Sequence, residues 1–286
     1  MTALQAEALA LEALLEEIRA TPKPGLVDLR DSGAHSDMDA DTFFLSARTI
    51  SPFLGRMFAA GIASPSSPQE LFLQLRVIGQ EAEAAMFAAT GAVNTHKGAI
   101  FTLGLLCAGA GIASRSSGTI HAGAVLSWCR EMAAGPLQAE LDAISRRLPS
   151  THGERLYLST GSTGIRGEAM AGFPSLLRIA LPALRENCQP DWNRQLLYTL
   201  LRLMETVEDS TILHRGGPQG LDWMRREAAS FLRTYPVLTD AAMNGLSCMN
   251  DAFVRRNLSP GGCADLLCGA VFLHQLEERS RKPVRL

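Results

Sequence analysis

The stretch Ala89–Leu106, ATGAVNTHKGAIFTLGLL, places a polar cluster directly before an apolar run. The residues from Gly98 onward are typical of a helix that enters the core, so the polar residues stand at its N-terminus. Backbone N–H groups without intrahelical partners and the positive end of the helix dipole suit that position to an anion. Lys97 adds a full positive charge. A capped turn with a solvated lysine accounts for the same residues, so this stretch alone leaves both interpretations open.

Helical periodicity extends over the rest of the chain. Leu4, Ala8, Leu11, Leu15 and Ile18 form one apolar stripe, which predicts a helix that ends before Thr21. Alternating strand patterns are scarce. The sequence therefore predicts an all-α protein, a single multi-helix, bundle-like domain over residues 1–286 whose glycine-rich polar loops line a cleft. Further helices are predicted at 41–61, 70–90, 98–113, 118–134, 136–148, 175–186, 191–207, 220–234, 239–256 and 263–278.

The composition is that of an ordinary globular protein, with 47% hydrophobic and 20% charged residues and a formal net charge of -2. No basic excess indicates a nucleic-acid partner. Glutamates interrupt the apolar N-terminal segment, which is unlike a signal peptide, and no run of about 18 apolar residues indicates a membrane span. The six cysteines are scattered without a C-x-x-C pair. We therefore expect a cytoplasmic protein with no membrane partner.

The loop TPKPGLVDLRDSGAHSDMD, residues 21–39, combines a constrained cation with several carboxylates. Pro22 and Pro24 stiffen the backbone around Lys23, and Gly25 permits a sharp turn. Oxygen-rich clusters of this kind suit Mg²⁺, while aspartates are also common caps of turns and helices. The acidic residues and the histidine in this region are Asp28, Asp31, His35, Asp37, Asp39 and Asp41.

Other glycine-rich loops carry cations beside carboxylates. In STGIRGEAMAGFP, residues 162–174, Arg166 offers a planar fork for phosphate, and Glu168 can hold that arginine or act as a base. A structural ion pair is the alternative. The loops VEDSTILHRGG (207–217) and NLSPGGCADLL (257–267) have the same character. The sequence contains no Walker A motif and no G-x-G-x-x-G motif after a strand, so neither common nucleotide-binding scheme applies.

Together and in this order, these loops resemble the triphosphoribosyl-dephospho-CoA synthase family over nearly the whole chain. The resemblance implies an all-helical enzyme that joins the triphosphoribosyl group of ATP to the 2'-hydroxyl of 3'-dephospho-CoA and releases adenine. It also implies Mg²⁺ and a product passed to a transferase that acts on the acyl carrier protein of citrate lyase or malonate decarboxylase. The matching motifs are PKPGLVD, GAHSDM, VNTHKGAIFTLGLL, RGEAMAGFP, LHRGG and NLSPGGCADLL.

The resemblance also suggests residue roles within a nucleotide cleft. Glu83, Glu168 and Asp37 are expected to be catalytic, and Asp28 and Asp209 are expected to bind the metal. The cations Lys23, His96, Lys97, Arg166 and Arg215 are expected to hold phosphates. The full set expected to bind substrates is Lys23, Gly25, His35, Asn94, Thr95, His96, Lys97, Gly98, Arg166, Gly167, His214 and Arg215.

Two positions depart from the family pattern. Thr211 stands where the family usually has Asn, which removes an amide that could contact ligand or metal, and Cys263 stands where a small residue, often Ser, is usual. The sequence does not distinguish citrate lyase from malonate decarboxylase. A homodimer through apolar helix faces is possible for an enzyme of this kind.

Two other interpretations make different predictions. An ATP-dependent kinase or phosphohydrolase could use the same cations and aspartates, and it predicts ADP or phosphate as product instead of adenine. A non-catalytic helical relative predicts no turnover, and a purely structural scaffold also predicts no stabilisation by nucleotide.

Overall fold

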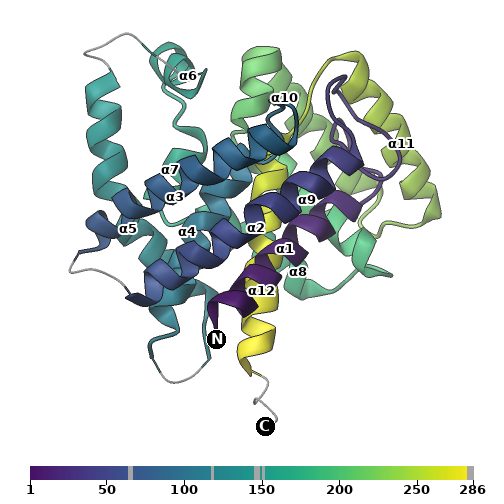
Figure 1. Ribbon diagram of the computed structural model, residues 1–286. Coiled ribbons are helices and arrows are strands. Elements are labelled where there is room, and N and C mark those ends of the chain that lie inside the picture. The colour runs from purple at the N-terminus through teal and green to yellow at the C-terminus, as the bar shows by residue number, and fades with distance from the viewer. Residues whose placement is uncertain (64–66, 117–118, 145–148, 150–151, 282–286) are drawn as a thin grey trace.

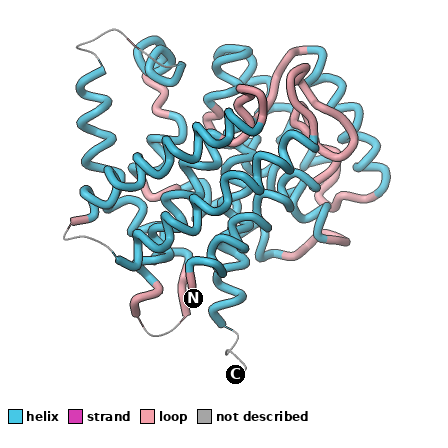
Figure 2. The backbone as a smooth tube through the Cα atoms, in the orientation of Figure 1, coloured by secondary structure: helices cyan, strands magenta, loops and turns pink. Residues whose placement is uncertain are grey.

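The computed structural model describes residues 1–63, 67–116, 119–144, 149 and 152–281. These residues form α-helices, one π-helical turn and no strand (Figure 2), which confirms the all-α prediction. The elements are α1 (Ala3–Arg19), α2 (Ala40–Ala63), α3 (Pro68–Ala89), α4 (Lys97–Ala113), α5 (Ala122–Ile144), α6 (His152–Thr160), α7 (Gly164–Met170), the π-turn η1 (Leu176–Ala180), α8 (Leu181–Glu186), α9 (Trp192–Thr206), α10 (Ser210–Thr234), α11 (Asp240–Arg255) and α12 (Gly261–Arg281).

The helix that follows the opening stretch lies in the core. Nearly every side chain of α4 between Ala99 and Ile112 is buried, as its apolar sequence predicts. It packs against α2, α3, α5 and α12, and α12 passes through the middle of the molecule in Figure 1. One continuous cluster of buried apolar residues reaches from α1 to α12. The extent of a single domain over residues 1–286 stays a prediction.

The helices α2 and α4 run in the same direction. Near their starts, the Ser46 hydroxyl lies 2.7 Å from Nδ1 of His96. Near their ends, Gly61 lies directly against the carbonyl of Ala108, so closely that a side chain on Gly61 would overlap it. Two parallel helices place their N-termini at the same end of the bundle.

The helix α12 shares this direction with α4. Gly98 in the first turn of α4 lies against the carboxylate of Asp265 in the first turn of α12, and one turn later Gly269 lies beside Thr102. Close packing of parallel helices brings their positive dipole ends together, an arrangement that negative charge stabilises. This end of the bundle is therefore electrostatically suited to anions.

The structure differs from the predicted helix boundaries first at α5. Residues 118–134 and 136–148 were expected as two helices, but α5 is continuous through Pro136 up to Ile144, and residues 145–148 lie outside the described part of the chain. The buried face that includes Met132, Ala133 and Leu137 continues across the proline, so packing offsets the lost hydrogen bond.

Short helices were missed at α6, α7 and the first half of α10. Within α10 the backbone of Gly217 adopts φ 61° and ψ -167°, and Pro218 follows it, so the helix is broken into two parts. Only the second part carries a clear apolar period. Among the described residues, no helix is both long enough and apolar enough to cross a membrane.

Candidate functional site

The loop after α1 buries a lysine. Lys23 is 0% exposed, and its ammonium donates hydrogen bonds to the carbonyl of Glu17, at 2.6 Å, and to the Glu17 carboxylate. Burial raises the pKa of Glu17, while Lys23 lowers it. Lys23 was expected to hold phosphate, but two of its three donors are already used inside the protein. One donor of its ammonium remains, and its phosphate-binding role stays a prediction.

Asp28 and Asp209 both bind backbone N–H groups. Asp28 accepts bonds from the amides of Lys23 (2.7 Å), Arg30 (2.7 Å) and Asp31 (3.2 Å), which fixes the turn of the 21–39 loop. An ionised carboxylate has about four acceptor positions, so three of them are used. These bonds leave Asp28 at most one acceptor position for the metal that it was expected to bind.

Asp209 connects two helix N-termini. Its Oδ1 accepts bonds from Thr211 (2.8 Å) and Ile212 (3.0 Å) at the start of α10, and its Oδ2 accepts a bond from the amide of Cys263 (2.8 Å) in α12. Burial raises the pKa of Asp209, and these amides lower it. Among the described residues there is no group of three or more metal-ligating side chains. This geometry makes Asp209 a link between helices.

The 21–39 loop also contacts the end of α11. Gly25 has φ +75°, its amide donates to Oδ1 of Asn250 at 2.8 Å, and a side chain at Gly25 would overlap the carbonyl of Leu258. Glycine is therefore required at this position. Its role is to bring the loop close to residues 257–260.

Arg215 and His35 form a polar cluster at the same place. Arg215 in α10 donates to the carbonyl of Ala34 (2.9 Å) and to Asn257 (3.1 Å), and it lies 3.2 Å from Nδ1 of His35. The other ring nitrogen of His35 lies 3.0 Å from the hydroxyl of Ser259. Burial lowers the pKa of His35, and the charge of Arg215 lowers it further. Three segments that are distant in the sequence thus meet around one guanidinium.

The start of α4 contains a buried histidine with an unused nitrogen. His96 is 3% exposed, bonds to Ser46 through Nδ1, and meets the ring of Phe43 edge-on at 4.8 Å. Burial, and to a smaller extent the charge of Lys23, lowers the pKa of His96 to about 3. No described group bonds its Nε2 atom. The lowered pKa favours a neutral ring, and the expected role of His96 in holding phosphate stays a prediction.

Asp265 was not predicted as a site residue. Its carboxylate lies directly against Gly98, where any side chain would overlap it, and the residue is partly exposed. Burial raises the pKa of Asp265 well above its usual value, with smaller contributions from Asp209 and Glu17, while the amide of Ala99 lowers it. In the sequence Asp265 is an ordinary first-turn aspartate, and only the contact with Gly98 singles it out.

Lys97 and Glu83 form an ion pair at the edge of this site. Their charged atoms lie 2.8 Å apart, with 54% and 28% of the two side chains exposed. The Asn94 side chain accepts the amide of Lys97 at 3.3 Å, and Thr95 donates to Ser46 at 2.7 Å. Both residues therefore order the loop before α4, and their expected contact with substrate stays a prediction. The direct partner of Glu83 is therefore Lys97.

The segment 164–175 is divided between two roles. Glu168 accepts bonds from the amide (3.1 Å) and the hydroxyl (2.6 Å) of Ser175, which closes the turn after α7. The expected ion pair with Arg166 does not form, and Arg166 is partly buried without a hydrogen bond or ion pair to another described residue. Gly164 packs against Ser210, so α7 starts beside the start of α10.

The remaining predicted residues lie at the margin or serve packing. The Asp37 side chain is 60% exposed, 3.8 Å from His35, and His214 is exposed on α10. Gly167 faces Thr163 across a contact that admits no side chain.

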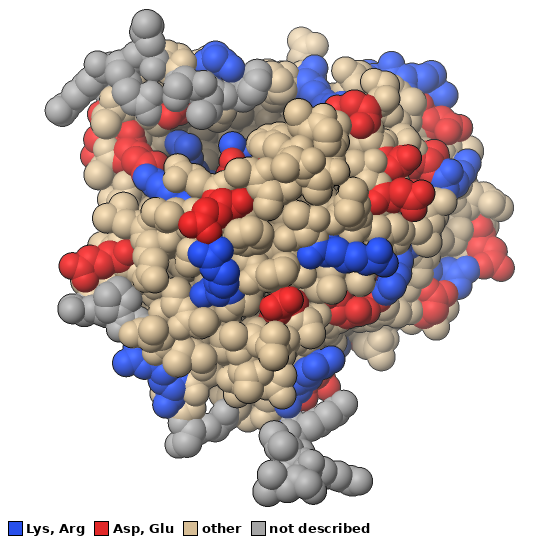
Figure 3. Space-filling view, in the orientation of Figure 1, with Lys and Arg blue, Asp and Glu red and all other residues tan. Residues whose placement is uncertain are grey.

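In Figure 3 a hollow with acidic and basic side chains in its walls opens in the upper left of this face, in the region of α6, α7 and α10 in Figure 1.

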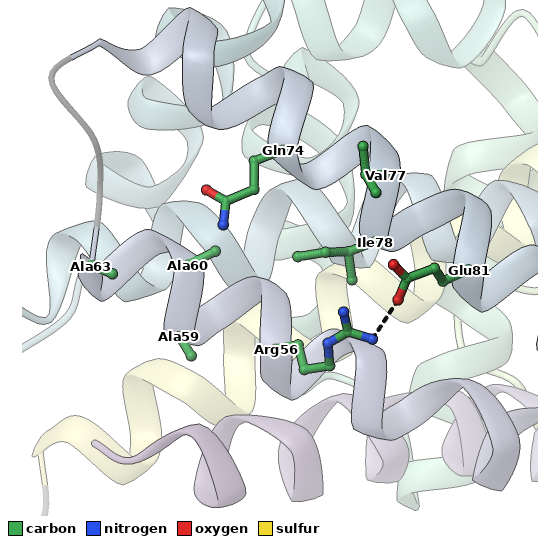
Figure 4. A pocket seen from close by; sticks show the side chains of 8 residues that line it. All are labelled: Arg56, Ala59, Ala60, Ala63, Gln74, Val77, Ile78 and Glu81. Atoms are coloured by element: carbon green, nitrogen blue, oxygen red, sulfur yellow. Dashed lines mark hydrogen bonds and ion pairs between the residues drawn. The ribbon is translucent and has the colours of Figure 1, made fainter.

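A second, shallower groove lies between α2 and α3 (Figure 4) and holds none of the predicted residues. Its lining residues are Arg56, Ala59, Ala60, Ala63, Gln74, Val77, Ile78 and Glu81.

Comparisons with known proteins agree with the motifs of the site loops. Residues 3–284 match a family model described as ATP:dephospho-CoA triphosphoribosyl transferase. The chain is 40% identical over 271 residues to a probable 2-(5''-triphosphoribosyl)-3'-dephosphocoenzyme-A synthase of Vibrio cholerae serotype O1 (strain M66-2), which covers 94% of this chain and 87% of that protein. A protein of the same name from Citrobacter koseri is 40% identical over 273 residues, covering 94% and 90%. No solved structure shows significant similarity to the chain.

Proposed function

Because the chain belongs to the ATP:dephospho-CoA triphosphoribosyl transferase family, we propose that it joins the triphosphoribosyl group of ATP to the 2'-hydroxyl of 3'-dephospho-CoA and releases adenine. In this reaction the bond from the ribose carbon C1'' to N9 of adenine breaks, and a bond from C1'' to the acceptor oxygen forms. The hydroxyl loses a proton and adenine gains one. The triphosphate remains intact throughout.

The observation that carries this proposal is the meeting of helix N-termini at one end of the bundle. Asp209 bonds amides at the starts of α10 and α12, and Asp265 lies against the start of α4. The dipoles of such termini favour a polyanion, and a triphosphate carries the charge that they favour. The carboxyl groups between them belong to proton transfer and to the stabilisation of the positively charged ribosyl centre.

The cations around this end fit the phosphates of two nucleotides. Lys97 and Arg215 lie at its edges, and Arg166 offers a guanidinium that has no partner among the described residues. Arginine can bind phosphate through two parallel hydrogen bonds, while lysine acts as a point charge. Glu83 positions Lys97 and, with Asp37, is proposed as a group that accepts the acceptor's proton. His96 offers a neutral ring nitrogen to the substrate.

Magnesium is proposed to accompany ATP on its phosphates. Mg²⁺ commonly uses phosphate oxygens, water and only one or two carboxylates, and it neutralises the charge of the triphosphate. The described residues offer it no preformed cluster, and Asp28 and Asp209 each retain at most one acceptor position. No step of the proposed reaction is therefore assigned to a metal that the protein itself holds.

The product places the enzyme in a cytoplasmic reaction sequence. We propose that a transferase attaches the triphosphoribosyl-dephospho-CoA to the acyl carrier protein of citrate lyase or malonate decarboxylase. Pairing of two copies through apolar helix faces stays a prediction. Light scattering during size-exclusion chromatography measures the molar mass of the eluting protein and so distinguishes a monomer from a dimer.

The decisive experiment is a product analysis. The purified protein is incubated with ATP, Mg²⁺ and 3'-dephospho-CoA, and the products are separated by chromatography and identified by mass spectrometry. Free adenine together with a dephospho-CoA adduct that retains all three phosphates is expected. ADP or phosphate without adenine would instead assign a kinase or phosphohydrolase. CoA, whose 3'-phosphate adjoins the acceptor hydroxyl, serves as the matched control and should react poorly.

A further inference from the structure

The departing adenine requires an acid, and most carboxyl groups near the site are unsuitable. Asp28 and Asp209 each accept three backbone hydrogen bonds, which occupy most of their acceptor positions. Glu83 is paired with Lys97, Glu168 with Ser175, and the Asp37 side chain is 60% exposed. Each of these carboxyl groups is therefore already engaged by the protein or by solvent.

Asp265 differs from these carboxyl groups in its position. It lies in the first turn of α12, against Gly98 in the first turn of α4, and its side chain is partly exposed. The residue can therefore reach a ligand that binds at the helix N-termini. No cation is among the groups that act on it.

The surroundings of Asp265 favour its protonated form. Burial acts first, and the carboxylates of Asp209 on α10 and Glu17 on α1 add repulsion, while only the amide of Ala99 opposes them. Lys23 is bonded to Glu17, and His96 at the start of α4 is neutral. The thiols of Cys263 and Cys268 on α12 also have raised pKa values, so they add no charge.

A second observation indicates a ligand at the same place. The Nε2 atom of His96 is buried beside the start of α4 and has no described partner. A buried ring nitrogen without a hydrogen bond is costly, and a bound substrate would satisfy it. Gly98, which contacts Asp265, follows His96 by two residues in the sequence.

We propose that Asp265 is a further catalytic residue, the acid that protonates the departing adenine; the assignment rests on the proposed function. As the C1''–N9 bond breaks, its electron pair passes to the purine, and the carboxyl group gives its proton to a ring nitrogen. The C1''–oxygen bond forms at the same carbon. The proton released by the acceptor hydroxyl reaches the Asp265 carboxylate through solvent and restores the acid.

The substitution Asp265→Asn tests this role because it keeps the shape and removes the transferable proton. With ATP, kcat should fall about 10²–10⁴-fold, the usual contribution of general acid catalysis. With 8-azaadenosine triphosphate, whose base departs more easily as an anion, the loss should be far smaller. Equal losses with both nucleotides, or an unchanged kcat with ATP, would overturn the proposal.

Two further variants control for folding. Asp222→Asn removes an exposed carboxyl on α10 and should change neither rate. Gly98→Ala leaves Asp265 intact but displaces its carboxylate, so it should lower kcat with ATP while the thermal unfolding transition is retained.

The unmodified enzyme provides a measurement that does not depend on variant folding. Its kcat with ATP should fall as the pH rises through the pKa of Asp265, whereas kcat with 8-azaadenosine triphosphate should change less. Identical profiles for both nucleotides would contradict the proposal. If the unmodified enzyme releases no adenine, the proposed function fails; if it does so and Asp265→Asn is equally active, only the present inference fails.

Discussion

The groove between α2 and α3 and the polar cluster at the helix N-termini differ in what they bury. The groove has a volume of about 580 Å³ and is lined by small and apolar side chains, and its Arg56–Glu81 ion pair is about half exposed (Figure 4). At the helix N-termini, in contrast, the side chains of Lys23, His96 and Asp209 are almost completely removed from solvent. The groove offers an open cavity, while the cluster holds the buried charged and polar groups.

The free energy that is gained or lost when polar groups are exposed or buried explains why this difference matters. An exposed ion pair contributes about 0.2–1 kcal/mol and is easily gained or lost. A buried charge or an unsatisfied polar group costs several kcal/mol unless it is paired. A protein that retains such groups at one place has a strained electrostatic arrangement, and such arrangements concentrate at functional sites. The buried cluster is thus the more informative region.

The largest effect is expected from Lys23→Met. The substitution leaves the Glu17 carboxylate buried without its partner, so the free energy of unfolding should fall by about 3–5 kcal/mol. Urea denaturation followed by circular dichroism measures the change. The double variant Glu17→Gln, Lys23→Met removes both charges and should recover most of the loss. If Lys23→Met alone is as stable as the unmodified protein, the pair is not the internal link described here.

A smaller effect is expected on ligand binding from Arg215→Ala. Arg215 contacts the 21–39 loop and Asn257, and we assign its charge to a substrate phosphate. Loss of a charged hydrogen bond costs about 1.5–3 kcal/mol, so the affinity for ATP or 3'-dephospho-CoA should fall roughly 10- to 100-fold. Isothermal titration measures both ligands, with the exposed Arg226→Ala on α10 as control. Unchanged affinities for both would show that Arg215 only holds the loops together.

The sequence predicted the architecture better than it predicted residue roles. Helices such as α1 and α4 follow from local periodicity, and the buried α4 follows from its apolar run. The contacts of Asp265 with Gly98 and of Asp209 with Cys263 depend on how distant helices are placed side by side. Spacing along the chain contains no such distances.

Burial shows what two predicted roles could not take into account. Lys23 and His96 were assigned to phosphates because of their charge and their place in polar loops. The fold instead directs the ammonium of Lys23 to Glu17 and removes His96 from solvent, which keeps its ring neutral. The charge of a side chain can be inferred from its residue type only when the solvent exposure of that side chain is known, because burial shifts its pKa.

The pH dependence of stability tests the burial of His96. Its pKa falls from 6.5 to about 3 on folding, so the neutral ring contributes stability above pH 6.5 that is lost as the pH decreases from 6.5 towards 3. The expected loss is about 1.4 kcal/mol for each pH unit below about 6. Urea denaturation at several pH values between 7 and 5 should show a shallower dependence for His96→Gln. Parallel curves for the two proteins would mean that folding does not lower the pKa of His96.

The smallest effect is expected from Arg56→Ala in the groove between α2 and α3. Arg56 bonds Glu81 at 2.6 Å and lies 5.3 Å from the ring of Phe53, and both contacts are exposed enough to be worth about 1 kcal/mol or less. The free energy of unfolding should therefore change little, and kcat and KM for both substrates should stay the same. Glu81→Ala is the matched control for the other half of the pair. A loss of affinity as large as that of Arg215→Ala would reverse the comparison, because it would place a substrate in the groove and show that its volume, and not the buried polar cluster, marks the functional site.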